Sequence, residues 1–376
     1  MRIGIDCRVL TKSNYTGVEV YTWNLVKNLI KEDISNTYTL YFDTKPTSKI
    51  ISELGLLGTK VELKVIKNFL SWTQLKLPVE LFFKPVDVFF SPIHTLPFLS
   101  CIWTKTLVMI HGLEYEKLKG NPLFNLLKGY HERVSALIAT HIVVPSAHTR
   151  NSLVSKFNIK SSKISVVNEG VDINPIVSGI ANSAEIQKKY RIESDYLIFV
   201  STVEPRKNIP FLVEVFSKYL SENPESNLIL LICGKMGWDY ANSINSPKKF
   251  GIDSRVKFLG YIPDEDLPGL VAGSKAFVSA STDEGFGLHL LEAMASGTKI
   301  LVSDIPAYRE IGSDYLKYFS LNNKLDFPAK LTQLLSENTT LDRNRQYSKI
   351  LTRYSWSQTA RDTLVILNSV ANSSFK

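Results

Sequence analysis

Short apolar runs alternate with amphipathic segments along the first half of the chain. Apolar side chains at Val18, Tyr21, Leu25 and Leu29 recur at three- and four-residue spacing, which predicts a helix over 18–30. We expect further helices near 75–83, 123–139 and 149–157, and strands at 3–5, 38–42, 61–66, 86–90, 106–110 and 141–145. Alternation of strand and helix indicates parallel strands that are covered by helices on both faces.

The pattern loosens near residues 166–172 and then restarts. The stretch 173–183 is rich in Ser, Asn, Gly and Pro without periodicity, so we predict a linker there. Strands are expected at 196–201, 228–233, 256–259, 276–279 and 299–303, with helices at 211–220 and about 357–369. This predicts an α/β protein of two doubly wound domains, residues 1–172 and 185–354, with a cleft between them and a final segment over 355–376. In such sheets ligands bind at the carboxyl ends of the strands.

Length and composition fit this picture. A chain of 376 residues is too long for one compact core.

Charges at Arg2, Asp6 and Arg8 interrupt the apolar N-terminal stretch, which therefore reads as a buried strand and not as a signal peptide. Apolar runs are far shorter than the ~20 residues of a membrane helix. Three widely spaced cysteines read as free thiols of a reducing compartment. We expect a cytoplasmic protein, with peripheral contact to the inner face of the cell membrane left open.

The positive charge lies in the first half of the sequence. Residues 1–170 hold 21 Lys and Arg against 13 Asp and Glu, whereas residues 171–376 hold 23 of each. Such asymmetry favours an anionic partner, which would be nucleic acid, a phospholipid surface or a phosphorylated substrate. The alternative explanation of the charge excess is that the lysines are scattered over the surface and only increase solubility. The basic residues are dispersed without a recognisable nucleic-acid-binding motif, so no nucleic-acid partner is expected.

Aromatic residues are dense between positions 69 and 103. One interpretation is core and interdomain packing. The other is an amphipathic face near residues 72–84, including Lys76 and Lys84, that docks on an anionic bilayer.

The most informative segment runs from Ser281 to Gly297. A predicted strand ends just before it, two glycines allow a tight backbone, and residues 288–295 read as a helix. The N–H groups at the start of that helix suit a phosphate. Glu284 precedes the helix and Glu292 lies on its second turn, and both carboxylates accept hydrogen bonds from hydroxyls. A ligand with phosphate in the middle and polyols on either side has this form, as a nucleotide sugar does.

A second segment, Ser201 to Asn208, follows the predicted strand at 196–200. Its adjacent Arg206 and Lys207 lie where a strand ends and are placed to neutralise a diphosphate. This interpretation of the pair is strengthened because the carboxylate-bearing segment is expected to follow a neighbouring strand.

The combination of Glu-Pro-Arg-Lys-Asn at 204–208 with two carboxylates separated by seven residues, Glu284 and Glu292, resembles family 4 of the retaining glycosyltransferases. Weaker matches cover nearly the whole chain, at 16–21, 108–113, 168–172 and 260–267. The resemblance implies the GT-B fold, in which two Rossmann-like domains face each other across a cleft. The first domain would bind the acceptor and the second the nucleotide sugar, and the final helix around Trp356 would cross back to the first.

The resemblance also implies roles for individual residues. Arg206 and Lys207 would hold the donor diphosphate, Glu292 the ribose hydroxyls, and Glu284 the donor sugar near its 3- and 4-hydroxyls. His111 would contact the donor sugar from the N-terminal side, so Glu284, His111, Arg206 and Lys207 form the expected catalytic set. The other expected donor-binding residues lie on three loops, namely Gly17, Tyr261, Ile262, Gly285, Phe286, Gly287 and Leu288.

The implied activity is transfer of a hexose with retention of its configuration and without a metal or further cofactor. GDP-mannose is the first donor expected and UDP-sugars the second. The expected acceptor is a glycan or a polyprenyl-diphosphate-linked oligosaccharide in cell-surface polysaccharide or lipopolysaccharide assembly. A nucleotide-sugar epimerase of similar fold is the alternative, because that activity also occurs on two facing Rossmann-like domains.

Three positions depart from the family pattern. The family usually has glycine at Ser201, aspartate at Gly112 and often proline at His289. Ser201 is small enough to be tolerated, whereas Gly112 removes a carboxylate from beside His111. His289 would either reach a donor hydroxyl or cap the helix. The sequence Asp264-Glu-Asp266 matches a metal-binding pattern, but an acidic helix start explains it better.

Overall fold

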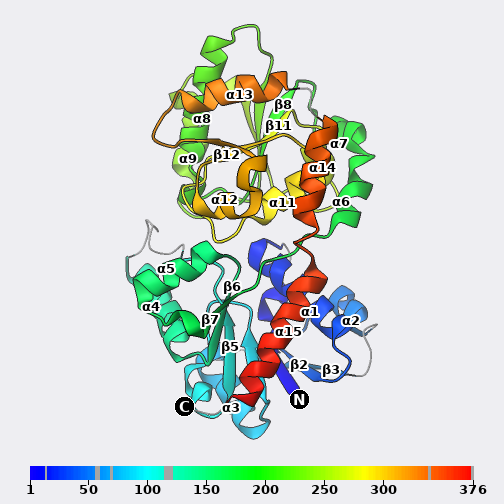
Figure 1. Ribbon diagram of the computed structural model, residues 1–376, viewed down its shortest axis with the longest axis vertical. Helices are drawn as coiled ribbons and strands as arrows, with labels where there is room; N and C mark the ends of the chain where they lie inside the picture. Colours follow the sequence, from blue (N-terminus) through cyan, green and yellow to red (C-terminus); the bar gives the residue numbers. More distant parts are fainter. Residues whose placement is uncertain (13–14, 56–59, 68–70, 114–121, 338–339, 374–376) are drawn as a thin grey trace. The chain divides into compact units, whose positions relative to one another are not determined.

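The computed structural model describes residues 1–376 except 13–14, 56–59, 68–70, 114–121, 338–339 and 374–376 (Figure 1). The described chain forms two compact units. The first holds the described residues up to Gly170 together with those from Tyr354 onward, and the second holds Val171–Arg353.

The first unit is built on a seven-stranded parallel sheet of order β3-β2-β1-β4-β5-β6-β7. The strands are β1 (Arg2–Asp6), β2 (Thr37–Phe42), β3 (Val61–Val65), β4 (Val88–Ser91), β5 (Lys105–Met109), β6 (His141–Val144) and β7 (Ile164–Val166). The α-helices are α1 (Gly17–Glu32), α2 (Ser48–Gly55), α3 (Leu77–Phe83), α4 (Pro122–Ile138), α5 (Ala147–Phe157) and α15 (Trp356–Asn372). Short helical turns are η1 (Arg8–Thr11), η2 (Trp72–Lys76), η3 (Phe98–Ile102) and η5 (Ser161–Lys163). The order reverses between β1 and β4, as in a doubly wound sheet.

The C-terminal helix α15 completes this unit. It packs on α1 and on β5, which are far from it in sequence. Gly170 lies against the start of α15, and a Cβ at that position would come within 2.3 Å of the backbone nitrogen of Trp356. The absence of a side chain at Gly170 therefore allows the helix to dock.

The second unit is built on a six-stranded parallel sheet of order β10-β9-β8-β11-β12-β13. The strands are β8 (Tyr196–Val200), β9 (Ile229–Cys233), β10 (Val256–Gly260), β11 (Ala276–Ser279), β12 (Ile300–Ser303) and β13 (Lys317–Phe319). The helices are α6 (Ile173–Ile180), α7 (Ser183–Lys189), α8 (Ile209–Glu222), α9 (Ala241–Lys249), α10 (Leu267–Ala272), α11 (Leu288–Ala295), α12 (Pro306–Gly312), α13 (Asp326–Ser336) and α14 (Thr340–Leu351). Short turns are η6 (Pro205–Lys207), η7 (Asp253–Arg255) and η8 (Ser313–Tyr315).

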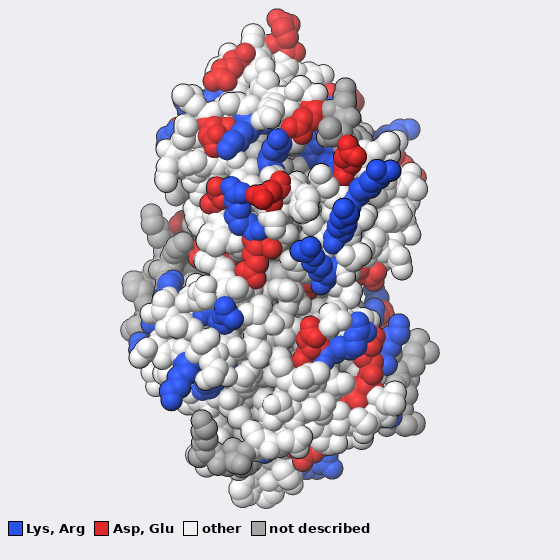
Figure 2. Space-filling model, in the orientation of Figure 1, with Lys and Arg blue, Asp and Glu red and all other residues white. Residues whose placement is uncertain are grey.

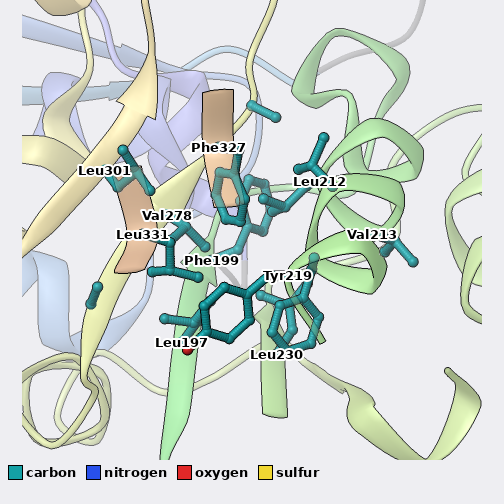
Figure 3. Packing of buried hydrophobic residues seen from close by; sticks show 14 of the residues in the cluster. Leu197, Phe199, Leu212, Val213, Tyr219, Leu230, Val278, Leu301, Phe327 and Leu331 are labelled. Atoms are coloured by element: carbon teal, nitrogen blue, oxygen red, sulfur yellow. The ribbon is translucent and has the colours of Figure 1, made fainter. Parts of the chain in front are cut away.

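Apolar side chains from the strands and from the helices that cover them fill the core of the second unit. Figure 3 shows Leu197 and Phe199 of β8 and Val278 of β11 packed against Leu212 of α8 and Phe327 of α13. These strands read as continuous apolar runs because a parallel sheet covered on both faces buries every side chain.

The linker predicted over residues 173–183 is wrong, because α6 and the start of α7 occupy it. Apolar residues at Ile173, Ile176 and Ile180 share one face of α6, and α6 packs against α10. Gly179 allows this close approach, since a Cβ there would lie 3.0 Å from the side chain of Pro268. The Gly and Pro residues that indicated a loop therefore belong to a helix contact.

No helix among the described residues is long and apolar enough to cross a membrane. On the face drawn in Figure 2, basic and acidic side chains are interspersed in both units.

Candidate functional site

The two motif-bearing loops of the second unit lie at the ends of neighbouring strands. β8 and β11 pair with each other, with β9 and β10 on one side and β12 and β13 on the other. Arg206 and Lys207 follow β8, and Glu284 follows β11. The amide of Thr282 donates to the carbonyl of Arg206 at 2.9 Å, which joins the two loops. The order of strands reverses at this point, and doubly wound sheets bind ligands there.

The carboxylate of Glu284 is buried and gathers donors from both loops. Lys207 Nζ donates to Oε1 at 2.6 Å, and Arg206 Nη1 donates to Oε2 at 2.5 Å. Ser281 Oγ donates to Oε1 at 2.7 Å. Glu284 therefore fixes the positions of both cations, as charge-assisted hydrogen bonds of this length do.

The local charges keep Glu284 ionised. Burial alone would raise its pKa, but the positive charges of Arg206 and Lys207 outweigh burial and hold the pKa well below its usual range. A second carboxylate, Glu204 Oε1, lies 2.5 Å from Nε of Arg206. Lys207 itself is 3% exposed, so its charge is largely removed from water and is weakly screened.

A buried polar chain connects this cluster to α12 and α11. The hydroxyl of Tyr308 lies 2.9 Å from Ser279 Oγ and 3.3 Å from Glu284 Oε1. His289 Nε2 lies 2.9 Å from the same hydroxyl, and its ring stacks on Phe277. Burial lowers the pKa of His289 to about 4, so the ring is neutral near pH 7. The His289 side chain thus contacts Tyr308 and does not cap α11.

The start of α11 needs a glycine and leaves its backbone donors without a side-chain cap. Gly287 has φ +129°, a conformation that side chains disfavour, and it stands at the N-cap position. No side chain caps the helix. The amide of Leu290 donates to the carbonyl of Gly287 at 2.9 Å, while the amides of Leu288 and His289 come too early in α11 for an acceptor within the helix. An uncapped helix start beside Arg206 and Lys207 favours an anion. Gly285, Phe286 and Leu288 form the same turn, and the Phe286 side chain is buried.

Glu292 lies one turn further along α11 and differs from Glu284 in its surroundings. Its carboxylate has no hydrogen-bond or ion-pair partner among the described residues, whereas its backbone carbonyl accepts from Ser296. Burial, together with the charge of Asp264, raises the pKa of Glu292 to about 7. A carboxylate held without a partner is placed to accept hydrogen bonds from a ligand.

The loop after β10 holds Asp264, whose charge acts on Glu292, and two of the predicted donor-binding residues. Tyr261 is partly exposed and Ile262 is buried, directly after Gly260 at the end of the strand. Asp266 precedes α10 but does not cap it with its side chain. Its carboxylate instead accepts from Lys189 Nζ at 2.6 Å and from the Tyr190 hydroxyl at 2.7 Å. The helix start expected after this acidic stretch is confirmed, because α10 begins at Leu267.

Two predicted residues, Gly17 and His111, lie in the first unit. Gly17 begins α1, and the carboxylate of Glu19 accepts from the amide and hydroxyl of Thr16. His111 follows β5, with Nδ1 3.0 Å from Glu169 Oε1 and Nε2 3.0 Å from the carbonyl of Pro92. Glu169, which lies 58 residues after His111, therefore places a carboxylate beside this ring.

Sequence reasoning did not assign a role to four side chains of these clusters. Ser281 and Glu204 stand inside the quoted motifs, so their proximity to Arg206 and Glu284 followed from the same spacing. Tyr308 and Glu169 had no local signal, because each reaches its partner only through the fold.

Comparisons with known proteins agree with this arrangement. Residues 15–175 match the family model described as Glycosyltransferase Family 4, and residues 182–350 match the one described as Glycosyl transferases group 1. The chain is 29% identical over 188 residues to O-antigen chain mannosyltransferase B of Escherichia coli, covering 50% of this chain and 49% of that protein. It is 27% identical over 216 residues to O-antigen chain mannosyltransferase RfbU of Salmonella typhimurium, covering 57% and 56%. The matches span about half the length of these relatives.

Solved structures share the fold over nearly the whole chain. Anabaena HepE in complex with UDP and glucose has a TM-score of 0.75 at 16% identity, covering 98% of this chain and 100% of that one. WaaG, a glycosyltransferase involved in lipopolysaccharide biosynthesis, has a TM-score of 0.72 at 14% identity, covering 97% and 99%. This likeness shows the GT-B type of fold, two Rossmann-like parallel-sheet domains. Since the two family models together span nearly all of residues 15–350, the chain belongs to glycosyltransferase family 4.

Proposed function

We propose that the chain transfers a hexose, with retention of anomeric configuration, from a nucleotide diphosphate sugar to a glycan or lipid-linked oligosaccharide. One observation carries the proposal. Arg206 and Lys207 are held by Glu284 beside the uncapped start of α11, at the point where the sheet order reverses. Fixed cations and backbone N–H groups at one place stabilise a departing diphosphate.

The roles divide between the residues by charge. Arg206 and Lys207 take the leaving diphosphate, and the backbone at Gly287 and Leu288 contributes N–H groups. The carboxylate of Glu292, which lacks a partner among the described residues, accepts from the ribose hydroxyls. Glu284 is ionised and already bonded to both cations, so it orients them and accepts from the sugar hydroxyls instead of exchanging protons. Retention then follows from departure of the diphosphate on the face where the acceptor enters.

The donor proposed first is GDP-mannose, with UDP-sugars second. Support comes from the relatives named mannosyltransferases, while HepE was solved with UDP. A polyprenyl-diphosphate-linked oligosaccharide is the proposed acceptor, because those relatives are named for the O-antigen chain. The names of these relatives support a transferase and do not favour the epimerase alternative.

The proposed reaction needs no metal, because Arg206 and Lys207 supply positive charge where the diphosphate leaves. Asp266 is already paired with Lys189 and Tyr190. Turnover should therefore persist in excess EDTA. Loss of turnover that added Mg²⁺ or Mn²⁺ restores would overturn the metal-independent mechanism.

The test combines binding with turnover. Melting temperature is measured with GDP, UDP, GDP-mannose and UDP-glucose, because a ligand that binds the native state raises it. Nucleoside diphosphate release is then measured with and without a short-chain polyprenyl-diphosphate acceptor, and the new linkage is assigned by NMR. Release that depends on acceptor, with an α-linked mannoside, is expected. Formation of an epimerised nucleotide sugar without acceptor would identify an epimerase and contradict the proposed transfer. A β-linked product would contradict retention of configuration.

A further inference from the structure

The helix α3 and the turn η2 before it carry apolar side chains on two opposite sides. Trp72, Leu77 and Leu81 are buried in the core of the first unit. On the other side Leu75, Val79 and Phe82 follow one another at four- and three-residue spacing, so they share one face. These three side chains are 52%, 55% and 62% exposed. An amphipathic helix on a globular protein would present polar residues there.

The exposed apolar surface continues onto η3, which packs beside α3. Phe83 is 75% exposed, and Leu99 and Ile102 of η3 are 56% and 72% exposed. The ring of Phe82 meets Phe83 and Trp103 edge to face, with centroids 5.4 and 5.5 Å apart. We call the surface formed by Leu75, Val79, Phe82, Phe83, Leu99 and Ile102 the α3/η3 face. A contiguous exposed apolar patch of this kind marks an interaction site.

The charges beside the α3/η3 face are positive. Lys76 and Lys84 are exposed at the two ends of α3, and neither forms a salt bridge to a described residue. The acidic residue of the helix, Glu80, is paired with Lys64 at 3.1 Å. Residues 1–170 as a whole carry eight more basic than acidic side chains. A second copy of the chain would bring the same charge to this face, whereas an anionic surface would complement it.

We infer that the α3/η3 face docks on an anionic lipid bilayer. The phenylalanine, leucine, valine and isoleucine side chains enter the boundary between headgroups and acyl chains, as the apolar side of an interfacial helix does. Lys76 and Lys84 extend to the lipid phosphates, each contributing roughly a fivefold gain in affinity. The docking does not require the proposed transfer activity, and it would bring the chain to the surface that holds a lipid-linked acceptor.

Flotation of the full chain with vesicles tests the inference. Vesicles of phosphatidylcholine alone are compared with vesicles that also contain phosphatidylglycerol, at low and at physiological salt. The unchanged chain should float with the anionic vesicles and much less with the neutral ones. Phe82→Ser/Phe83→Ser and Lys76→Glu/Lys84→Glu should each lower recovery at least about tenfold. Ile34→Ser is the matched control, because Ile34 is 85% exposed and lies outside the face.

Each other outcome would overturn the inference. Equal recovery with neutral and anionic vesicles would remove the role of charge, and unchanged recovery of the Phe82→Ser/Phe83→Ser variant would remove the role of the face. A dimer that this variant abolishes, without vesicle binding, would identify a protein interface instead. Melting temperature verifies that each variant is folded. Transfer to a water-soluble acceptor should be unchanged in all variants, so failure to float is distinguishable from failure of the proposed function.

Discussion

The carboxylate of Glu169 lies 3.0 Å from Nδ1 of His111, while Nε2 of the same ring lies 3.0 Å from the carbonyl of Pro92. Both neighbours are hydrogen-bond acceptors, so they hold the ring from two sides and fix its orientation. The side chain of Glu169 is buried, so this contact is shielded from water.

Glu169→Gln should loosen the orientation of His111, because it replaces the charged acceptor beside Nδ1 with a neutral amide. Turnover should fall at least about tenfold if His111 contacts the donor sugar, since a misplaced group in a reaction site loses rate steeply. Turnover assays measure the effect, and melting temperature verifies that the variant is folded. Unchanged turnover in folded Glu169→Gln protein would exclude a role of this contact in positioning His111.

Lys207→Met and Glu284→Gln should separate binding from turnover. Lys207→Met removes a buried cation from the diphosphate position, so the Kd for nucleoside diphosphate should rise roughly 10- to 100-fold. Glu284→Gln keeps both cations, so nucleoside diphosphate should still bind while transfer falls at least about tenfold. Titration calorimetry and turnover assays measure the two effects.

Lys275→Met is the control for this pair, because Lys275 forms an exposed ion pair with Asp195 in the same unit. Lys207→Met also leaves Glu284 with one cation fewer, and a lower melting temperature is expected. Lys207→Arg keeps the charge and distinguishes lost stability from lost binding. Nucleoside diphosphate affinity that is unchanged in folded Lys207→Met would exclude Lys207 from the diphosphate site.

Glu292→Gln should stabilise the unliganded protein and weaken nucleotide binding. The pKa of Glu292 is about 7 in the folded chain against 4.5 ordinarily, so the folded state binds the proton more tightly. Ionisation therefore costs stability as pH rises from 4.5 through 7, and the cost is constant above that range. The variant should gain about 1–3 kcal/mol at pH 8 and nothing near pH 4.

The same variant should bind nucleoside diphosphate at least about tenfold more weakly, because hydroxyls lose a charged acceptor. Glu193→Gln, an exposed carboxylate of the same unit, should change neither property. The measurement is the difference in free energy of unfolding between Glu292→Gln and the unchanged chain. If this difference were the same at pH 8 as at pH 4, it would contradict the raised pKa.

Gly170→Ala should destabilise the first unit. The new Cβ would stand 2.3 Å from the nitrogen of Trp356, and backbone cannot move aside without shifting the start of α15. A loss of about 1–3 kcal/mol is expected from such overpacking. Denaturant unfolding measures it, and an unchanged midpoint would mean that α15 does not dock as described.

Sequence patterns were sufficient for the strongly apolar strands and insufficient where packing overrides local preference. The run at 228–233 could only be a buried strand, and β9 occupies it. β13 has three residues, too few to show a period, and was not predicted. Pro175 and Gly179 oppose a helix locally, yet α6 forms because its apolar face is buried against α10 and glycine permits the close contact.

The same division holds at the site. Arg206, Lys207 and Glu284 could be brought together in advance because each follows a strand, and parallel strands end at one edge of a sheet. The contacts of Glu284 with Tyr308 and of His111 with Glu169 could not, because they join segments 24 and 58 residues apart that no local pattern relates. Strand ends that share one sheet edge can be paired from the sequence, whereas contacts with a helix or with a distant loop require the fold.

Gly17→Ala offers the cleanest test of a role for the first unit in donor binding. A Cβ at Gly17 would meet no atom within 4 Å, and Gly17 is the first residue of α1, where alanine is a better helix former. The variant should therefore be as stable as the unchanged chain or slightly more so, by about 0.4–1 kcal/mol. If the donor diphosphate approaches this helix start, the methyl group should obstruct it and lower kcat/KM for the donor at least about tenfold. Melting temperature and donor kinetics on the same sample separate the two effects. Unchanged kinetics in a folded Gly17→Ala protein would remove Gly17 from the donor site.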